Sequence, residues 1–207
     1  MAVAPNLRTR VASQSIFAQL VSLACHDLRT PLATASGFAH TLQRLDSLEE
    51  PADRYVDMID AASEQMAELL DLLGAAARIE AGRFDVQPRE ADSRKLVDAA
   101  VARLDGHAVA EGGGATVQVD PPWAETSLAS LAECVRRHGA LEQVTLTVDG
   151  AAVSIEPVAD GVGAIALGDD LKDFGAAVGS RVLDAMGAEL EVDGERLVVR
   201  LPQARVG

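Results

Sequence analysis

Apolar residues recur at helical spacing through the first 80 residues of the chain. The pattern begins near Val11 and ends near Leu45, and its apolar positions are Ile16, Leu20, Leu23, Leu28, Leu32, Phe38 and Leu42. A polar stretch at residues 46–51 follows, in which Ser47 can cap a second helix and Pro51 can stand in its first turn. The spacing therefore predicts two long helices joined by a short turn, as an antiparallel hairpin.

The second predicted helix carries a wide apolar stripe. Its positions follow steps of three, four or seven: Tyr55, Met58, Ala62, Leu69, Leu72, Ala76 and Ile79, widened by Ile59, Met66 and Leu73. Because a two-helix hairpin cannot bury the stripes of both helices, we expect a second copy of the chain to complete a dimeric four-helix bundle. The alternative is that the stripes pack against the rest of the same chain.

After Gly82 the periodicity changes to short strands and shorter helices. Strands are expected at Arg83–Gln87, Thr116–Val119, Val144–Val148, Ala152–Ile155, Glu189–Val192 and Arg196–Leu201, with hairpin turns at Asp149-Gly150 and Asp193-Gly194. Helices are expected at Ser93–Ala110, Thr126–His138 and Leu171–Met186, and residues 111–115 should form a flexible turn.

This order of elements predicts an α+β fold. The C-terminal part should be an α/β sandwich, with helices on one face of a mixed sheet. The expected organisation is an N-terminal tail at residues 1–10, a helical hairpin at residues 11–82 and the sandwich domain at residues 83–207.

Composition narrows the classes of partner and compartment. The 207 residues carry a net charge of −14, which argues against a nucleic-acid partner because such a partner requires a basic face. The two cysteines, Cys25 and Cys134, have no metal-binding spacing and are typical of a reducing cytoplasm. We see no apolar run long enough for a bilayer and no signal peptide, so we expect a cytoplasmic protein without a membrane sensor.

The segment Ser22–Leu32, SLACHDLRTPL, combines groups that suit phosphoryl transfer. On a helix, His26 and Thr30 share one face, and Asp27 is the next residue round. An imidazole can attack phosphorus, a neighbouring carboxylate can hold its other ring proton, and a hydroxyl one turn on can position water. Pro31 leaves the carbonyl of Asp27 without its helical partner, which predicts a kink after the histidine.

The sequence HDLRTPL at residues 26–32 resembles the phosphoacceptor box of histidine kinases. The resemblance implies that His26 is the phosphorylated residue, Asp27 the acid/base and Thr30 the phosphatase hydroxyl. The alternative is a histidine merely exposed on a helix. Residues 11–82 then resemble a dimerisation and phosphotransfer domain. The stretches IEAGRFDV at residues 79–86 and DAMGAELEVDGERLVVRLP at residues 184–202 are similar to the family's exit from the second helix and its C-terminal end.

Residues 83–207 thus resemble the ATP-binding domain of such kinases, but its nucleotide-binding boxes are altered. Cys134 stands where the family has a metal-ligating asparagine, and a thiol is a poor ligand for Mg²⁺. Ala159 stands at the aspartate position of the adenine box, with Asp160 displaced by one residue, although a bulge would restore it. In the phosphate box, only Gly175 remains of two glycines, and Asp173 places a negative charge at a predicted helix start, where it would repel phosphate.

The resemblance and these departures together predict a degenerate ATPase domain that binds no cofactor. We expect no ATP, no cofactor-binding residues and no metal ligands in this chain, and Mg²⁺ only on a partner. The remaining histidines, His40, His107 and His138, have no metal-binding spacing and are expected on surfaces or helix ends.

The expected function is that of a histidine phosphotransferase in a two-component phosphorelay. His26 would exchange phosphoryl groups with aspartates of response-regulator receiver domains, and the chain would form a homodimer through its hairpin, with no nucleic-acid or membrane partner. Two alternatives stay open: a soluble ATP-dependent histidine kinase with divergent boxes, and a non-catalytic module that binds receivers. Thr30 also allows a phosphatase variant of the first function.

Overall fold

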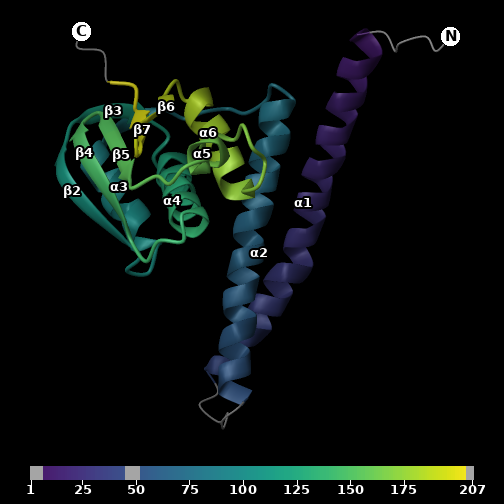
Figure 1. Cartoon of the computed structure of the whole chain (residues 1–207). Coiled ribbons are helices and arrows are strands. Elements are labelled where there is room, and N and C mark those ends of the chain that lie inside the picture. Colours follow the sequence, from purple (N-terminus) through teal and green to yellow (C-terminus); the bar gives the residue numbers. More distant parts are fainter. Residues whose placement is uncertain (1–6, 45–51, 204–207) are drawn as a thin grey trace. The chain divides into compact units, whose positions relative to one another are not determined.

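The computed structural model describes residues 7–44 and 52–203 (Figure 1). The chain divides into two compact units, Met1–Arg83 and Phe84–Gly207, so the fold is α+β with a helical unit first and a mixed unit second. The predicted roles of Ser47 and Pro51 in the turn lie outside the described residues. Within the described residues, no helix is both long and apolar enough to span a membrane.

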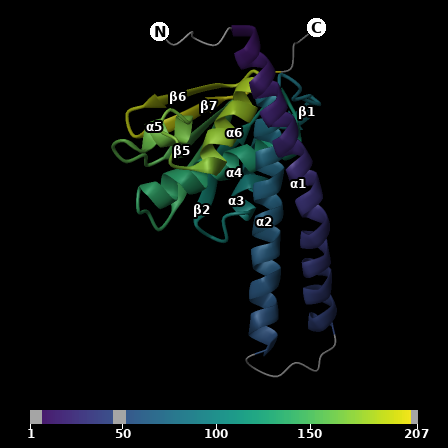
Figure 2. The same ribbon diagram turned by 90° about the vertical axis from the view of Figure 1, so that its right-hand side faces the viewer.

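The first unit is the predicted hairpin, formed by α1 (Leu7–Gln43) and α2 (Ala52–Glu80), which lie side by side in both views (Figures 1 and 2). Residues 7–10, assigned above to a tail, belong to α1 instead. The physical reason is that no glycine or proline stands between Leu7 and Pro31 to stop the helix. The α-helix also continues through Pro31, although this residue cannot donate to the carbonyl of Asp27.

Small and polar side chains join the two helices of the hairpin. Cys25 and Ala39 of α1 and Val56 and Ser63 of α2 are buried. Towards the end of the hairpin where the two helices are connected, Asp60 of α2 accepts a hydrogen bond from Ser36 Oγ at 3.2 Å. The same carboxylate lies 3.0 Å from His40 Nε2. Further along, Gln43 Nε2 donates to Asp57 at 2.9 Å. These contacts set the pairing of α1 with α2.

The first part of the apolar stripe that the sequence predicts for α2, up to Leu69, lies on the surface, whereas Leu72 further along is buried. The buried positions of α2 run through Val56 and Ser63, whereas the larger apolar side chains beside them are exposed. The exposed set comprises Tyr55, Met58, Ile59, Met66 and Leu69 of α2 and Leu28, Phe38 and Leu42 of α1. The hairpin therefore has two apolar sides, of which only one is used between its own helices.

The second unit is built on a five-stranded mixed sheet with the order β2-β4-β5-β7-β6. Its strands are β2 (Ala108–Gly114), β4 (Val144–Gly150), β5 (Ala152–Glu156), β6 (Glu189–Asp193) and β7 (Arg196–Arg200). β2 pairs in parallel with β4, and the other pairs are antiparallel. A separate two-stranded sheet pairs β1 (Arg89–Asp92) with β3 (Thr116–Val119).

Helices pack on the sheet and enclose the core of this unit. They are α3 (Ser93–Ala102), α4 (Pro121–His138), α5 (Val162–Leu167) and α6 (Phe174–Ala185). Alternate residues of β4 are buried while their neighbours are not, as expected for a sheet with one face under helices. The largest fully buried side chains include Leu128, Leu131, Leu146, Ile155, Leu183 and Leu197. The predicted sandwich is confirmed.

Three predicted elements near the start of this unit are wrong. The strand expected at Arg83–Gln87 is irregular, and the pairing begins at Arg89, after Pro88, which has no N–H to donate. The helix expected to reach Ala110 ends at Ala102, because the chain reverses at Asp105 and Gly106, both with positive φ. Residues 111–114, expected as a flexible turn, belong to β2, whose partner is the distant strand β4.

Helix boundaries and one short helix also differ from the expectation. α4 begins at Pro121 and not near Thr126, since proline fits the first turn of a helix. α5 has six residues between two left-handed glycines, Gly161 and Gly168, and is too short to show a helical period. α6 begins at Phe174, directly after Asp173.

Candidate functional site

His26 lies on the surface of α1 with its carboxylate neighbour beside it. Its side chain is 79% exposed, and that of Asp27 is 69% exposed. His26 Nδ1 lies 3.2 Å from Asp27 Oδ1. When Nδ1 carries the proton and donates it to this carboxylate, Nε2 carries the lone pair of the neutral imidazole. The geometry therefore gives an accessible nucleophile whose tautomer is set by its neighbour.

The other residues of the segment complete this surface. Thr30 follows one helical turn after His26 and is also exposed, and its carbonyl accepts a hydrogen bond from Thr34 Oγ1 at 3.0 Å. Cys25, just before the histidine and about 100° round the helix from it, is buried, so that side of α1 faces the interior. Arg29 forms an ion pair with Asp71 of α2. α1 thus presents His26, Asp27 and Thr30 outward from a helix that is tied to its partner.

The position of the metal-ligating asparagine in the kinase pattern is filled by a buried thiol. Cys134 lies inside α4 with no exposed surface. Burial, with a contribution from the negative charge of Asp173, raises the pKa of the Cys134 thiol to about 12. A neutral, soft thiol does not suit Mg²⁺, which requires oxygen ligands. This residue therefore does not fit a magnesium nucleotide.

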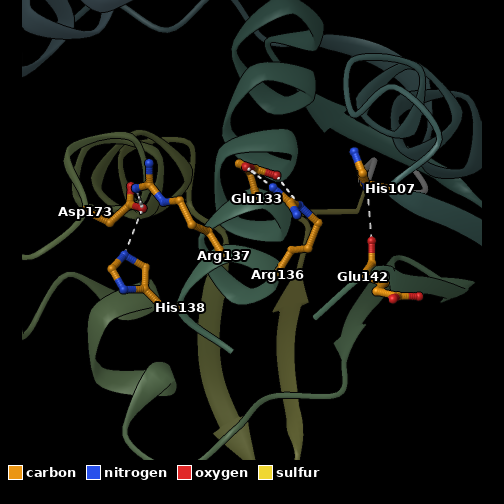
Figure 3. Close-up of polar contacts among 7 residues, drawn as sticks. All are labelled: His107, Glu133, Arg136, Arg137, His138, Glu142 and Asp173. Atoms are coloured by element: carbon orange, nitrogen blue, oxygen red, sulfur yellow. Dashed lines mark hydrogen bonds and ion pairs between the residues drawn. The ribbon is translucent and has the colours of Figure 1, made fainter. Parts of the chain in front are cut away.

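The helix start that would bind phosphate is capped by the chain itself. Asp173 is the N-cap of α6, and its Oδ1 accepts from the backbone N–H of Ala176 at 3.0 Å. Its other oxygen, Oδ2, accepts from Arg137 Nη2 at 2.5 Å, as Figure 3 shows. The side chain of Asp173 is only 7% exposed. A carboxylate held at this point occupies the amide end of the helix and repels an anion.

The remaining glycines of the two boxes serve the packing of the domain. Gly175 lies against Ser130, because a Cβ at this glycine would stand 3.4 Å from that side chain. A Cβ at Gly163 would stand 2.7 Å from Val192 Cγ2. Asp160, the displaced aspartate of the adenine box, is exposed beside Gly161, which has a φ of 78°. At the metal and phosphate boxes, Cys134 and Asp173 do not fit a magnesium–ATP complex.

His138 is the residue whose surroundings the sequence interpretation missed. His40 pairs with Asp60, and His107 Nδ1 lies 3.1 Å from the carbonyl of Glu142, as expected for isolated histidines. His138, however, lies with Cys134 and Asp173, and the nearest ligand atoms of the three residues are all within 4.8 Å of one another. The spacing of four between Cys134 and His138 on one helix was the available signal.

Known proteins resemble this chain most clearly in its helical hairpin. Residues 18–82 match the family model of the His Kinase A (phospho-acceptor) domain. The chain is 32% identical over 81 residues to the probable sensor histidine kinase TcrY of Mycobacterium tuberculosis, a match that covers 39% of this chain. It is 35% identical over 82 residues to the histidine protein kinase DivJ of Caulobacter vibrioides, covering 38% of this chain. The chain spans only 17% and 14% of the length of these two relatives.

Solved structures share the fold over nearly the whole chain. Full-length ShkA, crystallised with AMPPNP, aligns with 90% of this chain and 47% of its own, with a TM-score of 0.60 and 20% identity. The histidine kinase AdeS of Acinetobacter baumannii aligns with 87% of this chain and 98% of its own, with a TM-score of 0.54 and 17% identity. Residues 18–82 are thus similar to the phospho-acceptor domain of histidine kinases, and the chain as a whole shares its fold with the solved histidine kinase AdeS.

Proposed function

We propose that this chain is a histidine phosphotransferase that exchanges phosphoryl groups between His26 and receiver-domain aspartates and does not use ATP. The observation that carries the proposal is the capped start of α6. A second observation supports the acceptor half: His26 is exposed beside Asp27 on the hairpin that matches the phospho-acceptor domain.

The transfer step follows from the geometry of the histidine. Nε2 attacks the phosphorus of an aspartyl phosphate on the partner, in line with the bond to the carboxylate oxygen. The N–P bond forms as the P–O bond breaks, and the aspartate leaves as a carboxylate. Asp27 stabilises the positive charge that develops on the ring, through the proton on Nδ1 at 3.2 Å. Mg²⁺ belongs to the receiver in this scheme.

Negative charge at the start of α6 disfavours the binding of ATP. A triphosphate brought to α6 would meet the carboxylate of Asp173, which already accepts the Ala176 N–H and the Arg137 guanidinium. Displacing this carboxylate would remove the helix cap and leave a buried charge without its partners. Cys134 adds no oxygen ligand for a magnesium ion.

A homodimer is part of the proposal. Among the side chains of the hairpin that the structure describes, eight large apolar ones are exposed, on a side that its own two helices do not use. A second hairpin covering this side would complete a four-helix bundle and remove these side chains from water. The two copies would carry one His26 each.

The test is transfer from a phosphorylated receiver to the full chain. Receiver domains are labelled with a radioactive small-molecule phosphodonor, freed of the donor, and mixed with the wild type, with His26→Ala, or with His40→Ala. The last variant is a matched control, since His40 is an exposed histidine of the same helix. We expect label on the wild type and on His40→Ala and none on His26→Ala.

Three outcomes contradict the proposal in different ways. Label that persists in His26→Ala places the acceptor elsewhere. Receivers that bind the chain in a pull-down but transfer no phosphate identify a non-catalytic binding module. Label that reaches His26 from radioactive ATP without any receiver identifies an ATP-dependent histidine kinase.

A further inference from the structure

Three side chains of different chemistry meet between α4 and α6. Cys134 and His138 are one turn apart on α4, and Asp173 is the residue before α6. Their ligand atoms lie within 4.8 Å of one another, and His138 Nε2 lies 3.3 Å from Asp173 Oδ2 (Figure 3). Cys134 and Asp173 are buried, and His138 is half-buried.

One polar atom of this cluster is unsatisfied. His138 Nε2 is buried and has no hydrogen-bond partner within the part of the chain that the structure describes. Its distance to Asp173 Oδ2 is short enough for an ion pair, but the direction of approach does not meet hydrogen-bond geometry. Buried nitrogen atoms without a partner are costly, and a cation placed between this nitrogen and Asp173 Oδ2, in place of Arg137, would give the nitrogen a partner.

The ligand set selects the kind of cation. Thiolate, imidazole and carboxylate are the ligands that Zn²⁺ takes in proteins, at about 2.0–2.3 Å, whereas Mg²⁺ requires oxygen ligands. Pairs of ligand atoms around a tetrahedral zinc ion are about 3.3–3.8 Å apart by these bond lengths. A pair at the 4.8 Å limit of the cluster would have to close by about 1 Å. We propose that Cys134, His138 and Asp173 bind a zinc ion, with a fourth position left for water.

The two oxygens of Asp173 have different partners, which decides which of them is available to a metal ion. Asp173 Oδ1 is engaged with the Ala176 N–H, so the cap of α6 can persist while Oδ2 binds the metal. Arg137 now donates to this same Oδ2, and its side chain is 58% exposed, so it can move outward. Arg137 is therefore the competitor of the metal for one carboxylate oxygen. Binding also releases the thiol proton of Cys134 to the solvent.

The site would have a structural consequence for the second unit. A bound ion would join the C-terminal half of α4 to the start of α6, at the positions where the kinase pattern has a metal-ligating asparagine and a phosphate box. Metal binding would thus stabilise the altered nucleotide region, independently of whether His26 receives phosphate.

The experiment uses the full chain, stripped with a chelator and titrated with Co²⁺ as a spectroscopic substitute for Zn²⁺. We expect one equivalent to give a thiolate-to-cobalt charge-transfer band, and one equivalent of Zn²⁺ to displace it and raise the melting temperature. Cys134→Ser should abolish the band, whereas Cys25→Ser, which changes the other buried thiol, should keep it. Asp173→Asn keeps a capping oxygen and should weaken zinc about tenfold or more.

A second variant separates binding from folding. Arg137→Gln removes the competitor of the metal and should tighten zinc several-fold, a change that a merely structural cluster would not produce. The proposal is overturned by the absence of a charge-transfer band in the wild type. It is equally overturned by a band that survives Cys134→Ser, or by Zn²⁺ affinities that do not respond to Asp173→Asn or Arg137→Gln in variants whose circular dichroism is native.

Discussion

His26 can attack phosphorus only while one of its ring nitrogens carries a free lone pair. The contact of its Nδ1 with Asp27 assigns that role to Nε2 and places a negative charge where the ring becomes positive. Both side chains are largely exposed, so the pair adds little to stability, and the role proposed for it is in the transfer reaction.

Replacing Asp27 by asparagine should slow transfer to His26. The amide can still accept the Nδ1 proton but cannot offset the charge of the phosphorylated ring, so we expect a loss of about 100-fold in the single-turnover rate. Rapid-quench measurement with a labelled receiver checks this. Asp53→Asn, an exposed carboxylate at the start of α2, is the control, and equal rates in both variants would contradict a role for Asp27.

Cys134 should make the metal-free protein sensitive to alkaline pH. Its thiol titrates near pH 12 when folded and near pH 9.0 when unfolded, so between these values the unfolded state binds fewer protons. The free energy of unfolding therefore falls as the pH rises, by at most about 1.4 kcal/mol per pH unit, and the decline begins about one pH unit below 9.0.

Urea unfolding in chelator at pH 8, 9 and 10 measures this slope. Cys134→Ser, which cannot ionise, should show a shallower decline between pH 9 and 10 than the wild type. Parallel declines would show that the thiol does not titrate between the two states.

Asp173 contributes to stability as a helix cap. Asp173→Ala removes the acceptor of the Ala176 N–H and should lower the free energy of unfolding by about 1 kcal/mol. Asp170→Ala is the matched control, because this carboxylate pairs with Lys172 on the surface and should cost about 0.5 kcal/mol or less. Equal losses in thermal or urea unfolding would mean that the cap of α6 is not formed in solution.

Among the helices, α2 carries the signal for association. In its first half, the buried residues Val56 and Ser63 lie on another side than the exposed apolar positions, so the exposed stripe can be changed without replacing them. Ile59→Lys places two charges in each dimer interface and should weaken dimerisation by about 100-fold or more.

Analytical ultracentrifugation measures the dissociation constant of this dimer. The control is Glu64→Lys, because Glu64 lies on the same helix but nearly half a turn round from Ile59. This variant should leave the dissociation constant unchanged. Unaltered helicity of both variants by circular dichroism excludes unfolding as the cause. A wild type that stays monomeric at micromolar concentration would refute the bundle.

Elements with local signals were predictable from the sequence, and elements fixed by distant partners were not. The two long helices and the β4–β5 and β6–β7 hairpins follow from periodicity and from glycine turns. β2 did not follow, because Glu111-Gly-Gly-Gly114 has no side-chain alternation and becomes a strand only by pairing with β4. Gly112 fits there because a Cβ would stand 2.0 Å from the Val148 carbonyl oxygen.

In the candidate sites, too, groups close in sequence were predictable and groups brought together by packing were not. His26, Asp27 and Thr30 are close in sequence, so one helical turn predicts their shared surface. The predicted placement of the Asp173 charge at a helix start is also a local property and agrees with the structure, in which Asp173 is the N-cap of α6. The approach of His138 to Asp173 depends on the packing of α4 against α6, which no local pattern reports.

In the molecule as a whole, acceptor and altered nucleotide positions belong to different units. His26 is in Met1–Arg83, whereas Cys134 and Asp173 are in Phe84–Gly207. The proposed relay therefore requires the first unit to keep its chemistry while the second keeps its fold without its nucleotide. This separation is what makes the source of the phosphate the decisive question.

Quantitative labelling of His26 from two donors, ATP and a phosphorylated receiver, identifies the source of the phosphate. The full chain is incubated with radioactive Mg–ATP alone, or with a phosphorylated receiver free of nucleotide, and phosphate on residue 26 is counted after protease mapping. The account predicts label near one phosphate per accessible His26 from the receiver, and from ATP no more than His26→Ala acquires. Label on His26 from ATP alone, lost in His26→Ala, would contradict it.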